Sequence, residues 1–338
     1  MMEKKNIKNK NIGIEILRIY LSFLVVNTHC YNRINNFKYI KILRNRLHVP
    51  TFFIISFYFF KNPLISRNLH KFRERFQRLL IPYIVWPIIF LLINTLISNY
   101  FNLELKKSYQ DLLNQILTGH CLNTVFWFQW NLIFETFFFI IIELIYHKYI
   151  VFILINVGLA CYFLQYSHYN YKIFSKYNSE KKYTFGRLAE TIPYSISGFF
   201  FAYFNLISFF QKNRIKTINI CLLIFILIFQ YHFLIEPKGF GYANFKLNIL
   251  SSCLFIIFSM ISNKLIIKNI SKMIFQISSF TPGIYYLHIP IKNYLENVFL
   301  FIKNGHLNGC FFIYLICYLI CILGNIFVRK TKLINLFQ

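Results

Sequence analysis

Three ionisable residues interrupt the first apolar run of the chain, and their types and spacing could support acid–base chemistry. Glu15, Arg18 and His29 lie in IGIEILRIYLSFLVVNTHC. Glu15 and Arg18 are three residues apart, so they share a helix face and can form an ion pair. His29 follows Arg18 by eleven residues, which is about 20° past three helical turns and about 16 Å along the axis. We therefore expect one helix face with a cation and, farther along, an imidazole that could act as a general base. A structural ion pair beside an unrelated interfacial histidine is the alternative.

Four basic residues precede the third apolar run. Lys71, Arg73, Arg75 and Arg78 lie in KNPLISRNLHKFRERFQRLLIPY. Arg75 and Arg78 are three residues apart, which predicts that both guanidinium groups leave the same face of a helix at the membrane surface. Two such planar groups side by side suit phosphate oxygens. The alternative is the ordinary excess of Lys and Arg on the cytoplasmic side of membrane helices.

Further ionisable residues occur inside later apolar segments, where a charged side chain is costly. Glu135 and Glu143 are eight residues apart and share a similar helix face, and Glu190 lies early in a later segment. His288 lies in SSFTPGIYYLHIP, where Pro-Gly at 282–283 and a Pro at 290 predict a kinked or interrupted helix. Broken membrane helices expose backbone groups to a cavity, so His288 is either a cavity residue or a satisfied packing residue.

The composition indicates that these residues belong to a membrane protein. Hydrophobic residues make up 57% of the chain, charged residues 14%, and the mean hydropathy is +0.49. These values argue against a soluble domain and a disordered chain, and eight Cys in 338 residues are too sparse for a disulfide-rich secreted module. A net charge of +26 would suggest nucleic acid in a soluble protein. In a membrane protein the same excess orients loops and contacts lipid, so no nucleic-acid partner is expected.

The apolar segments predict an all-α, polytopic integral membrane protein with about ten transmembrane helices, since each span needs about 20 apolar residues. A polar stretch at 102–117 fits a helix on the membrane surface. With no internal repeat and no long linker, residues 1–338 form a single transmembrane domain. The ten expected spans are 12–31, 47–60, 79–98, 124–146, 149–166, 186–207, 217–235, 246–262, 277–301 and 308–328.

The distribution of Lys and Arg favours both termini on the cytoplasmic side, with residues 1–11 and 329–338 as cytoplasmic segments. The first helix is expected to be retained, because Glu15 and Arg18 interrupt its apolar run and the residues before Cys30 are bulky, unlike a signal-peptide cleavage site. The cysteines contain no CxxC pair, and we expect them to pack in the core without a metal site.

Five segments together resemble a known family. The first is Glu15, Arg18 and His29 at their spacing. The second runs from Phe52 to Tyr58 and is similar to F-F-x-x-S-G-[FY], with Phe57 where the family has Gly. The others are the R-x-x-R and L-x-x-P pattern in residues 75–82, the W-[FY] pair at 127–128, and the Y-L-x-H segment that ends at residue 288. In this order they resemble acyltransferase family three, ten-helix membrane O-acyltransferases that acetylate sugars of surface polysaccharides and related glycans.

The resemblance implies acetyl-CoA as the acyl donor, arriving from the cytoplasm. It implies that Arg75 and Arg78 hold the phosphates, with Arg73 and Lys71 nearby, and that the pantetheine arm passes Arg18. His29 would then act as a general base on a sugar hydroxyl or take the acetyl group as a covalent intermediate. In the same resemblance, Glu15 would orient Arg18. The acceptor side would be lined by Trp127, His288 and Ser56.

The acceptor implied by the resemblance is a hydroxyl of an extracytoplasmic or lipid-linked glycan, and the expected location is the cell membrane. Two other classes stay open at this point. A transporter or exporter of a glycan would also suit intramembrane carboxylates and a broken helix, although many transporters show an internal repeat that this sequence lacks. The third class is a membrane scaffold that has lost its activity. It stays open because Phe57 stands where the family has Gly.

Overall fold

The computed structural model is helical throughout the part of the chain that it describes, which is 11–30, 47–100, 113, 116, 126–171, 179–235, 245–262, 266–295 and 307–328. The predicted all-α class is confirmed. The helices are α2 (Ile12–Cys30), α4 (His48–Ile65), α5 (Leu69–Tyr100), α7 (Phe126–Tyr146), the short 3-10 helix η2 (His147–Tyr149), α8 (Ile150–Tyr171), α9 (Ser179–Tyr203), α10 (Leu206–Lys212), α11 (Arg214–Ile235), α12 (Phe245–Ser259), α13 (Lys268–Ser279), α14 (Thr281–Leu295) and α16 (Leu307–Val328).

Several of these helices are long and apolar enough to cross a membrane. Within the described residues, length and composition give five candidate spans, or six if the bent pair Arg187–Tyr203 and Leu206–Lys212 forms one span. This supports a multi-pass membrane protein, while the ten spans and the side of each terminus stay predictions. The five candidates are Ile12–Cys30, Leu69–Ile93, Phe126–Gln165, Arg214–Tyr231 and Leu307–Phe327.

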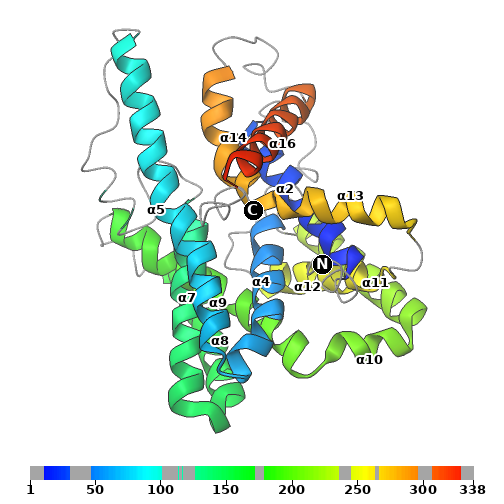
Figure 1. Cartoon of the computed structure of the whole chain (residues 1–338). Helices are drawn as coiled ribbons and strands as arrows, with labels where there is room; N and C mark the ends of the chain where they lie inside the picture. Colours follow the sequence, from blue (N-terminus) through cyan, green and yellow to red (C-terminus); the bar gives the residue numbers. More distant parts are fainter. Residues whose placement is uncertain are drawn as a thin grey trace.

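Helix α4 lies at the centre of the bundle and packs against α2, α5, α7, α9 and α12 (Figure 1). Its closest neighbour is α9, because Gly198 of α9 faces the backbone of Ile54. A Cβ at position 198 would lie 2.2 Å from the carbonyl oxygen of Ile54. Phe57 stands where the family that the sequence resembles has a glycine, which would allow a close approach of two helices at that point. The structure has that approach one turn earlier in α4, with the glycine on the partner helix.

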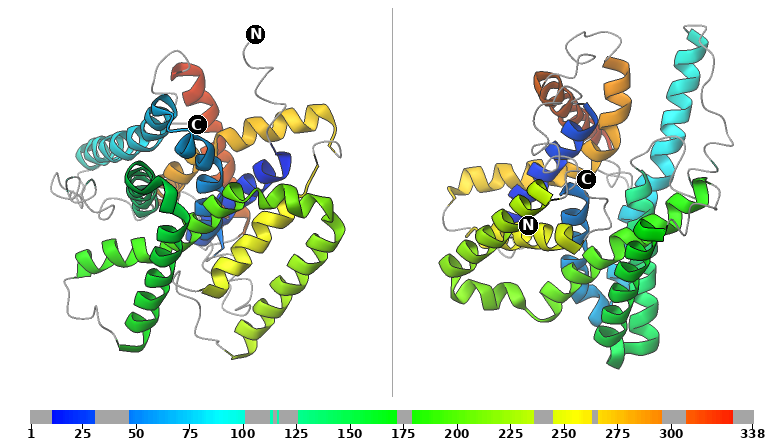
Figure 2. Two further views of the ribbon diagram at one scale, coloured as in Figure 1. Left: turned by 90° about the horizontal axis from the view of Figure 1, so that it is seen from below. Right: turned by 180° about the vertical axis from the view of Figure 1, so that it is seen from behind.

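Helix α2 is enclosed by α4, α12, α13, α14 and α16, and Figures 1 and 2 show α2, α14 and α16 side by side. The start of α2 is fixed to α12. Asn11 donates to the carbonyl oxygen of Ser259 at 2.7 Å, and its own Oδ1 accepts from the backbone N–H of Gly13 at 2.9 Å, capping the helix. Gly13 allows the approach, since a Cβ there would lie 1.8 Å from the carbonyl oxygen of Phe258.

Four predicted spans differ in the structure or in how the candidate spans count them. Residues 124–146 and 149–166 correspond to the separate helices α7 and α8 with η2 between them, although by length and composition Phe126–Gln165 counts as one candidate span of 40 residues. The segment 186–207 is followed by a 61° bend into α10, where Asn205 adopts a left-handed conformation with φ 50°. The predicted helix 277–301 contains a helix start, because α13 ends at Ser279 and α14 begins at Thr281. Pro282 therefore lies in the first turn of α14, where a proline has no N–H bond to lose.

Some predictions fall on residues outside those that the structure describes. The surface helix at 102–117 is outside them except for residues 113 and 116, and so are the C-terminal segment 329–338 and all of the N-terminal segment 1–11 except Asn11.

Candidate active site

The ion pair predicted on the first helix is present. Arg18 Nη1 lies 2.9 Å from Glu15 Oε2, and the Glu15 carboxylate is buried. The second amino group of Arg18 donates to Thr281 Oγ1 at 3.3 Å. Because Thr281 is the first residue of α14, the guanidinium joins α2 to the helix that carries His288. Arg18 thus has a partner on another helix, Thr281, as well as Glu15, the local partner that the spacing predicted.

Helices α2 and α14 also bring two histidines together. The imidazole rings of His29 and His288 have centroids 5.1 Å apart and are tilted by 46°. His288 is fully buried, and its Nδ1 lies 2.8 Å from the carbonyl oxygen of Tyr285. Since a carbonyl can only accept, Nδ1 carries the proton of the neutral ring and Nε2 holds a lone pair. This buried Nε2 has no hydrogen-bond partner among the described residues.

Two more basic side chains act on this histidine pair, and sequence reasoning missed both. His48, at the start of α4, is buried and interacts electrostatically with His288. Lys292, one turn after His288 on α14, interacts electrostatically with His29. Lys292 follows His288 by four residues, a spacing that places both on one helix face and that could have been recognised in the sequence.

Four basic residues were predicted to bind phosphate. Of these, Arg75 has its side chain directed into the bundle, where it donates to residues of α4 and α7. Its Nε donates to Thr136 Oγ1 at 2.9 Å, its Nη2 to Ser56 Oγ at 3.0 Å, and its Nη1 to the carbonyl oxygen of Ser56 at 3.3 Å. The guanidinium carbon also lies 4.2 Å from the ring centroid of Phe60 and 5.1 Å from that of Phe57. Such cation–π contacts hold an arginine in place.

Phe57 thus has a structural part at this position. Its ring is buried and packs against Phe139 with centroids 4.6 Å apart, besides lying beneath Arg75. Ser56, predicted on the acceptor side, binds Arg75 instead of lying with the histidines. Ser56 is eight residues after His48 on α4, which is about 12 Å along the axis.

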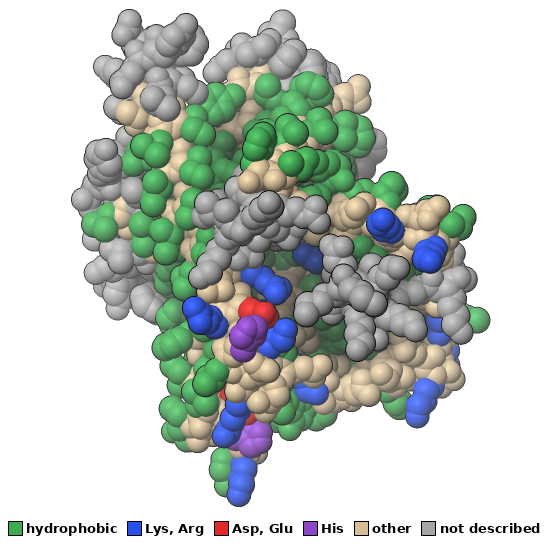
Figure 3. All heavy atoms as spheres, viewed as in Figure 1, with side chains coloured by type: hydrophobic (Ala, Val, Ile, Leu, Met, Phe, Trp, Pro, Cys, Tyr) green, Lys and Arg blue, Asp and Glu red, His purple; other side chains and the backbone are tan. Residues whose placement is uncertain are grey.

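Lys71, Arg73 and Arg78 lie exposed on the outer side of α5. Lys71 pairs with Glu74 at 3.2 Å and Arg78 with the same carboxylate at 3.9 Å, whereas Arg73 has no ion pair within the described residues. Figure 3 shows Lys and Arg side chains over the middle and lower parts of one face, while hydrophobic side chains cover much of its upper part. Arg75 and Arg78 therefore differ in setting, one half-buried and one exposed.

Trp127 lies at the start of α7 with a cation over its ring. The guanidinium carbon of Arg187 is 4.7 Å from the ring centroid, and Arg187 pairs with Glu190 at 3.1 Å. The residues on either side of Trp127 contact α14: Phe126 stacks on Tyr286 at 5.5 Å, and Phe128 packs on Tyr285 at 5.2 Å. The start of α7 is thus held against the turn that precedes His288.

Glu135 belongs to a buried hydroxyl network between α7 and α9. Its carboxylate is fully buried and accepts from Thr191 Oγ1 at 2.5 Å and from Ser195 Oγ. Asn131 donates to the same Thr191 at 2.9 Å. Thr136, which accepts from Arg75, follows Glu135 directly. The hydroxyl network therefore lies next to the residue that binds the arginine. Thr191, Ser195 and Thr136 were not singled out from the sequence, although each is a hydroxyl residue within an apolar run.

Glu143 lies in a separate cluster with Arg67 and His147. Its Oε1 contacts Nδ1 of His147 and lies 3.6 Å from Nε of Arg67, and Arg67 adopts a left-handed backbone with φ 48°. This cluster joins the end of α4 to the end of α7. It contains no residue that we predicted for the site. Within the described residues, no group of three or more His, Cys, Asp or Glu side chains could hold a metal ion.

The fold and the site define a multi-helix protein with a histidine centre and an arginine centre that share α4. A family model described as an acyltransferase domain matches residues 11–329, nearly the whole chain. The chain therefore belongs to acyltransferase family three, which supports acyltransferase activity with an acyl donor and an acceptor. Neither a curated protein nor a solved structure matches the chain.

Proposed function

We propose that the protein is a membrane O-acyltransferase that moves an acetyl or other short acyl group from acyl-CoA to a hydroxyl of a glycan. The observation that carries the proposal is the contact between His29 and His288, with ring centroids 5.1 Å apart. A buried imidazole with a free lone pair beside a second imidazole suits proton transfer to or from a hydroxyl. The Glu15–Arg18 pair lies on the same helix face as His29, about three turns away.

The donor would bind at the arginine centre. Three of the five guanidinium N–H groups of Arg75 are used by Ser56 and Thr136, which leaves two for a phosphate oxygen. The exposed Arg78, Arg73 and Lys71 add positive charge at the same end of α5. Because rigid, already oriented guanidinium groups lose little freedom on binding, Arg75 would be the main phosphate contact.

The acyl group would then reach the histidines along the helices that link the two centres. Arg18 lies about 16 Å from His29 along α2, and Ser56 about 12 Å from His48 along α4. In the transfer, the hydroxyl oxygen forms a bond to the thioester carbonyl carbon and the carbon–sulfur bond breaks. His29 accepts the hydroxyl proton and returns a proton to the sulfur of the leaving thiolate, so the products are an ester and free CoA thiol.

An extracytoplasmic or lipid-linked glycan would enter on the side of Trp127 and His288. Aromatic rings suit the apolar faces of sugars, and the ion pair Arg187–Glu190 beside Trp127 offers donors and acceptors to hydroxyl groups. The same proposal has the whole chain as one transmembrane domain of the cell membrane, with both termini cytoplasmic.

The test measures transfer of labelled acetyl from acetyl-CoA to glycan in membranes that contain the wild type or a variant. We expect His29→Ala to lower transfer about a hundredfold or more, since general acid–base catalysis contributes at least that much. Arg75→Ala should lower it mainly at low acetyl-CoA, whereas Arg75→Lys should keep part of the affinity.

The matched control for His29→Ala is His70→Ala, which removes a histidine whose side chain is 76% exposed and pairs with Glu74 on α5 instead of belonging to the histidine centre. This variant should transfer acetyl at the wild-type rate. If His29→Ala and Arg75→Ala, expressed at the wild-type level, transfer as fast as the wild type, the proposed site is wrong. Movement of a glycan across the membrane without any acyl-CoA would instead favour a transporter.

A further inference from the structure

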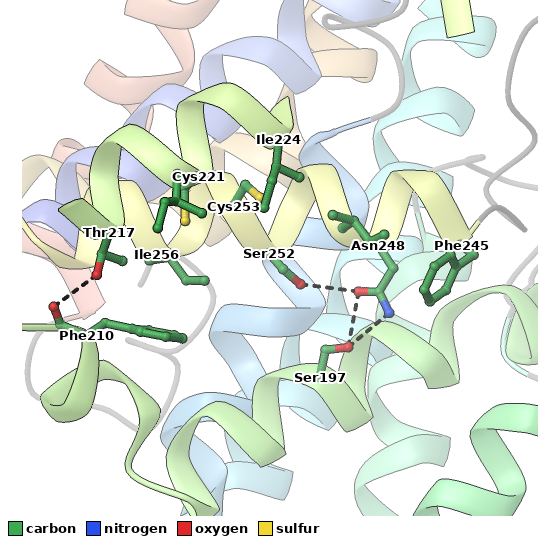
Figure 4. A pocket seen from close by; sticks show the side chains of 12 residues that line it. Ser197, Phe210, Thr217, Cys221, Ile224, Phe245, Asn248, Ser252, Cys253 and Ile256 are labelled. Atoms are coloured by element: carbon green, nitrogen blue, oxygen red, sulfur yellow. Dashed lines mark hydrogen bonds between the residues drawn. The ribbon is translucent and has the colours of Figure 1, made fainter. Parts of the chain in front are cut away.

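A hollow of about 410 Å³ opens between α9, α10, α11 and α12, away from both centres of the proposed site. Figure 4 shows Phe210 and Thr217 at one end, Asn248 and Phe245 at the other, and Cys221 and Cys253 between them. The lining residues Phe245 and Ile256 are eleven apart on α12, so the hollow is about 16 Å long. One leaflet of a bilayer is about 15 Å thick in its hydrocarbon part, which is the length that one lipid chain covers.

The polar atoms in this hollow already have partners. Asn248 Nδ2 donates to Tyr162 at 2.7 Å and to Ser197 at 2.9 Å, and Asn248 Oδ1 accepts from Ser197 at 3.1 Å and from Ser252 at 3.5 Å. Thr217 donates to the carbonyl oxygen of Phe210 at 3.3 Å. The remaining lining is mainly aliphatic, aromatic and thiol side chains. An occupant therefore needs no polar groups here, and hydrocarbon fits.

The hollow opens onto a face that suits contact with lipid. Only 6% of the candidate span in α11 is buried, and Ile220, which lines the hollow, is 46% exposed. Neighbouring α11 residues such as Leu223 and Leu227 are exposed as well. Because α11 packs mainly on α12 and α10, hydrocarbon in the hollow would fill the space between α11 and α9.

Three basic residues lie beside one end of the hollow. Lys212, Arg214 and Lys216 fall between Phe210 and Thr217, which line that end. Lys212 and Lys216 are exposed and Arg214 is half-buried. None of the three has an ion pair among the described residues. Unneutralised Lys and Arg at a membrane surface attract anionic lipid headgroups.

We propose that this hollow binds one anionic glycerophospholipid, with an acyl chain between α9, α11 and α12 and its phosphate at Lys212, Arg214 and Lys216. The proposal goes beyond acyl transfer and does not depend on it. The bound lipid would hold the peripheral helix α11 on the bundle, so it would act as a structural cofactor. No residue of the proposed catalytic or donor site lies in α10, α11 or α12.

The experiment uses the full chain, purified in detergent, stripped of lipid and then equilibrated with phosphatidylglycerol or phosphatidylcholine. Mass spectrometry counts the lipid retained per protein, and the thermal midpoint reports stabilisation. The wild type should retain phosphatidylglycerol about a hundredfold better than phosphatidylcholine, since each of the three basic residues near an anionic headgroup adds about fivefold. Equal retention of the two lipids by the wild type would overturn the proposal.

Two kinds of variant separate the headgroup from the chain. The triple variant Lys212→Gln, Arg214→Gln, Lys216→Gln should lose the preference for phosphatidylglycerol but still bind either lipid weakly. Ser252→Phe fills the hollow and should lose both lipids, and Thr217→Phe repeats the test at the other end if Ser252→Phe does not fold. If Ser252→Phe or Thr217→Phe folds and retains lipid as the wild type does, the proposal is contradicted.

The matched controls lie outside the hollow. Lys268→Gln with Lys272→Gln removes two exposed cations on α13, and Leu223→Phe adds the same ring on the exposed side of α11. Both should retain phosphatidylglycerol at the wild-type level, and a loss in either would mean that the effect is not specific to the hollow. Acetyl transfer is measured separately on the same samples, so failure of this proposal and failure of the proposed function are distinguishable.

Discussion

The backbone of α14 fixes the proton of His288. Nδ1 donates to the carbonyl oxygen of Tyr285 at 2.8 Å, so the free lone pair stays on the buried Nε2 beside the ring of His29. A ring held in one tautomer can accept a proton without first reorienting. Proton transfer would thus be shared between His29 and its neighbour.

We expect His288→Ala to lower acetyl transfer about a hundredfold while leaving the affinity for acetyl-CoA unchanged, because His288 lies at the histidine centre and not at Arg75. Transfer rates over a range of acetyl-CoA concentrations give both quantities. A Michaelis constant for acetyl-CoA that rises about a hundredfold in this variant would show instead that His288 supports donor binding or the fold.

Removal of a single hydroxyl tests the support of Arg75. Thr136→Val keeps the shape of the side chain but takes away the acceptor 2.9 Å from Arg75 Nε. We expect about a tenfold higher Michaelis constant for acetyl-CoA, since hydrogen bonds to charged groups contribute about 1.5–3 kcal/mol.

The control for that variant is Thr95→Val, which removes a hydroxyl on α5 that, among the residues the structure describes, donates to the carbonyl oxygen of Leu91. It should leave the Michaelis constant at the wild-type value. A normal constant for Thr136→Val would mean that its bond to Arg75 is not used in donor binding.

At the scale of helices, the two centres depend on the close contact of α4 with its neighbours. α4 carries His48 at its start and Ser56 about two turns later, and α9 approaches it through Gly198. The hydroxyls of α9 that hold Glu135 are set by the same contact, since Thr191 and Ser195 lie on the turns just before Gly198.

Gly198→Ala should destabilise the protein by at least about 2 kcal/mol, because the new Cβ would lie 2.2 Å from the carbonyl oxygen of Ile54. Gly158→Ala is the matched control, since its Cβ would meet only the end of the Ile196 side chain at 3.4 Å. Thermal unfolding in detergent measures both. Equal midpoints for the two variants would show that α4 and α9 can separate without cost.

Local features of these helices were predictable from sequence, and long-range ones were not. The Glu15–Arg18 pair follows from a spacing of three residues, which fixes the two side chains on one face. The contact between His29 and His288 joins residues 259 positions apart, and no periodicity encodes which distant helices meet. The Pro-Gly at 282–283 predicted a kinked or interrupted helix, and the structure has an interruption, because α13 ends at Ser279 and Pro282 lies in the first turn of α14. The hydroxyl support of Glu135 was missed, since Thr191 and Ser195 are too common in membrane helices to stand out.

At the scale of the whole molecule, the excess of Lys and Arg has two distinct parts. Most of the basic residues fit orientation of the chain in the membrane. In the two proposals made above, a smaller set would bind anions: Arg75 in the bundle with Arg78, Arg73 and Lys71 outside it, and Lys212, Arg214 and Lys216 beside the hollow of α9–α12.

The proposed orientation gives a direct prediction. A fluorescent protein that folds only in the cytoplasm should be bright when fused at residue 338, and alkaline phosphatase that needs the extracytoplasmic side should be inactive there. The same pair of fusions at the N-terminus should give the same result. Opposite results at the two termini would mean an odd number of spans and would contradict the ten-helix topology.

The proposed function depends on transfer of an acyl group to a glycan by His29 with its neighbour His288. Its most direct test is mass spectrometry of surface glycans from cells that carry the wild-type chain, His29→Ala or no chain. We expect one additional acetyl or other short acyl group on one sugar with the wild type, and its absence with His29→Ala and without the chain. An identical acyl pattern in wild-type and His29→Ala cells, at equal protein levels, would contradict it.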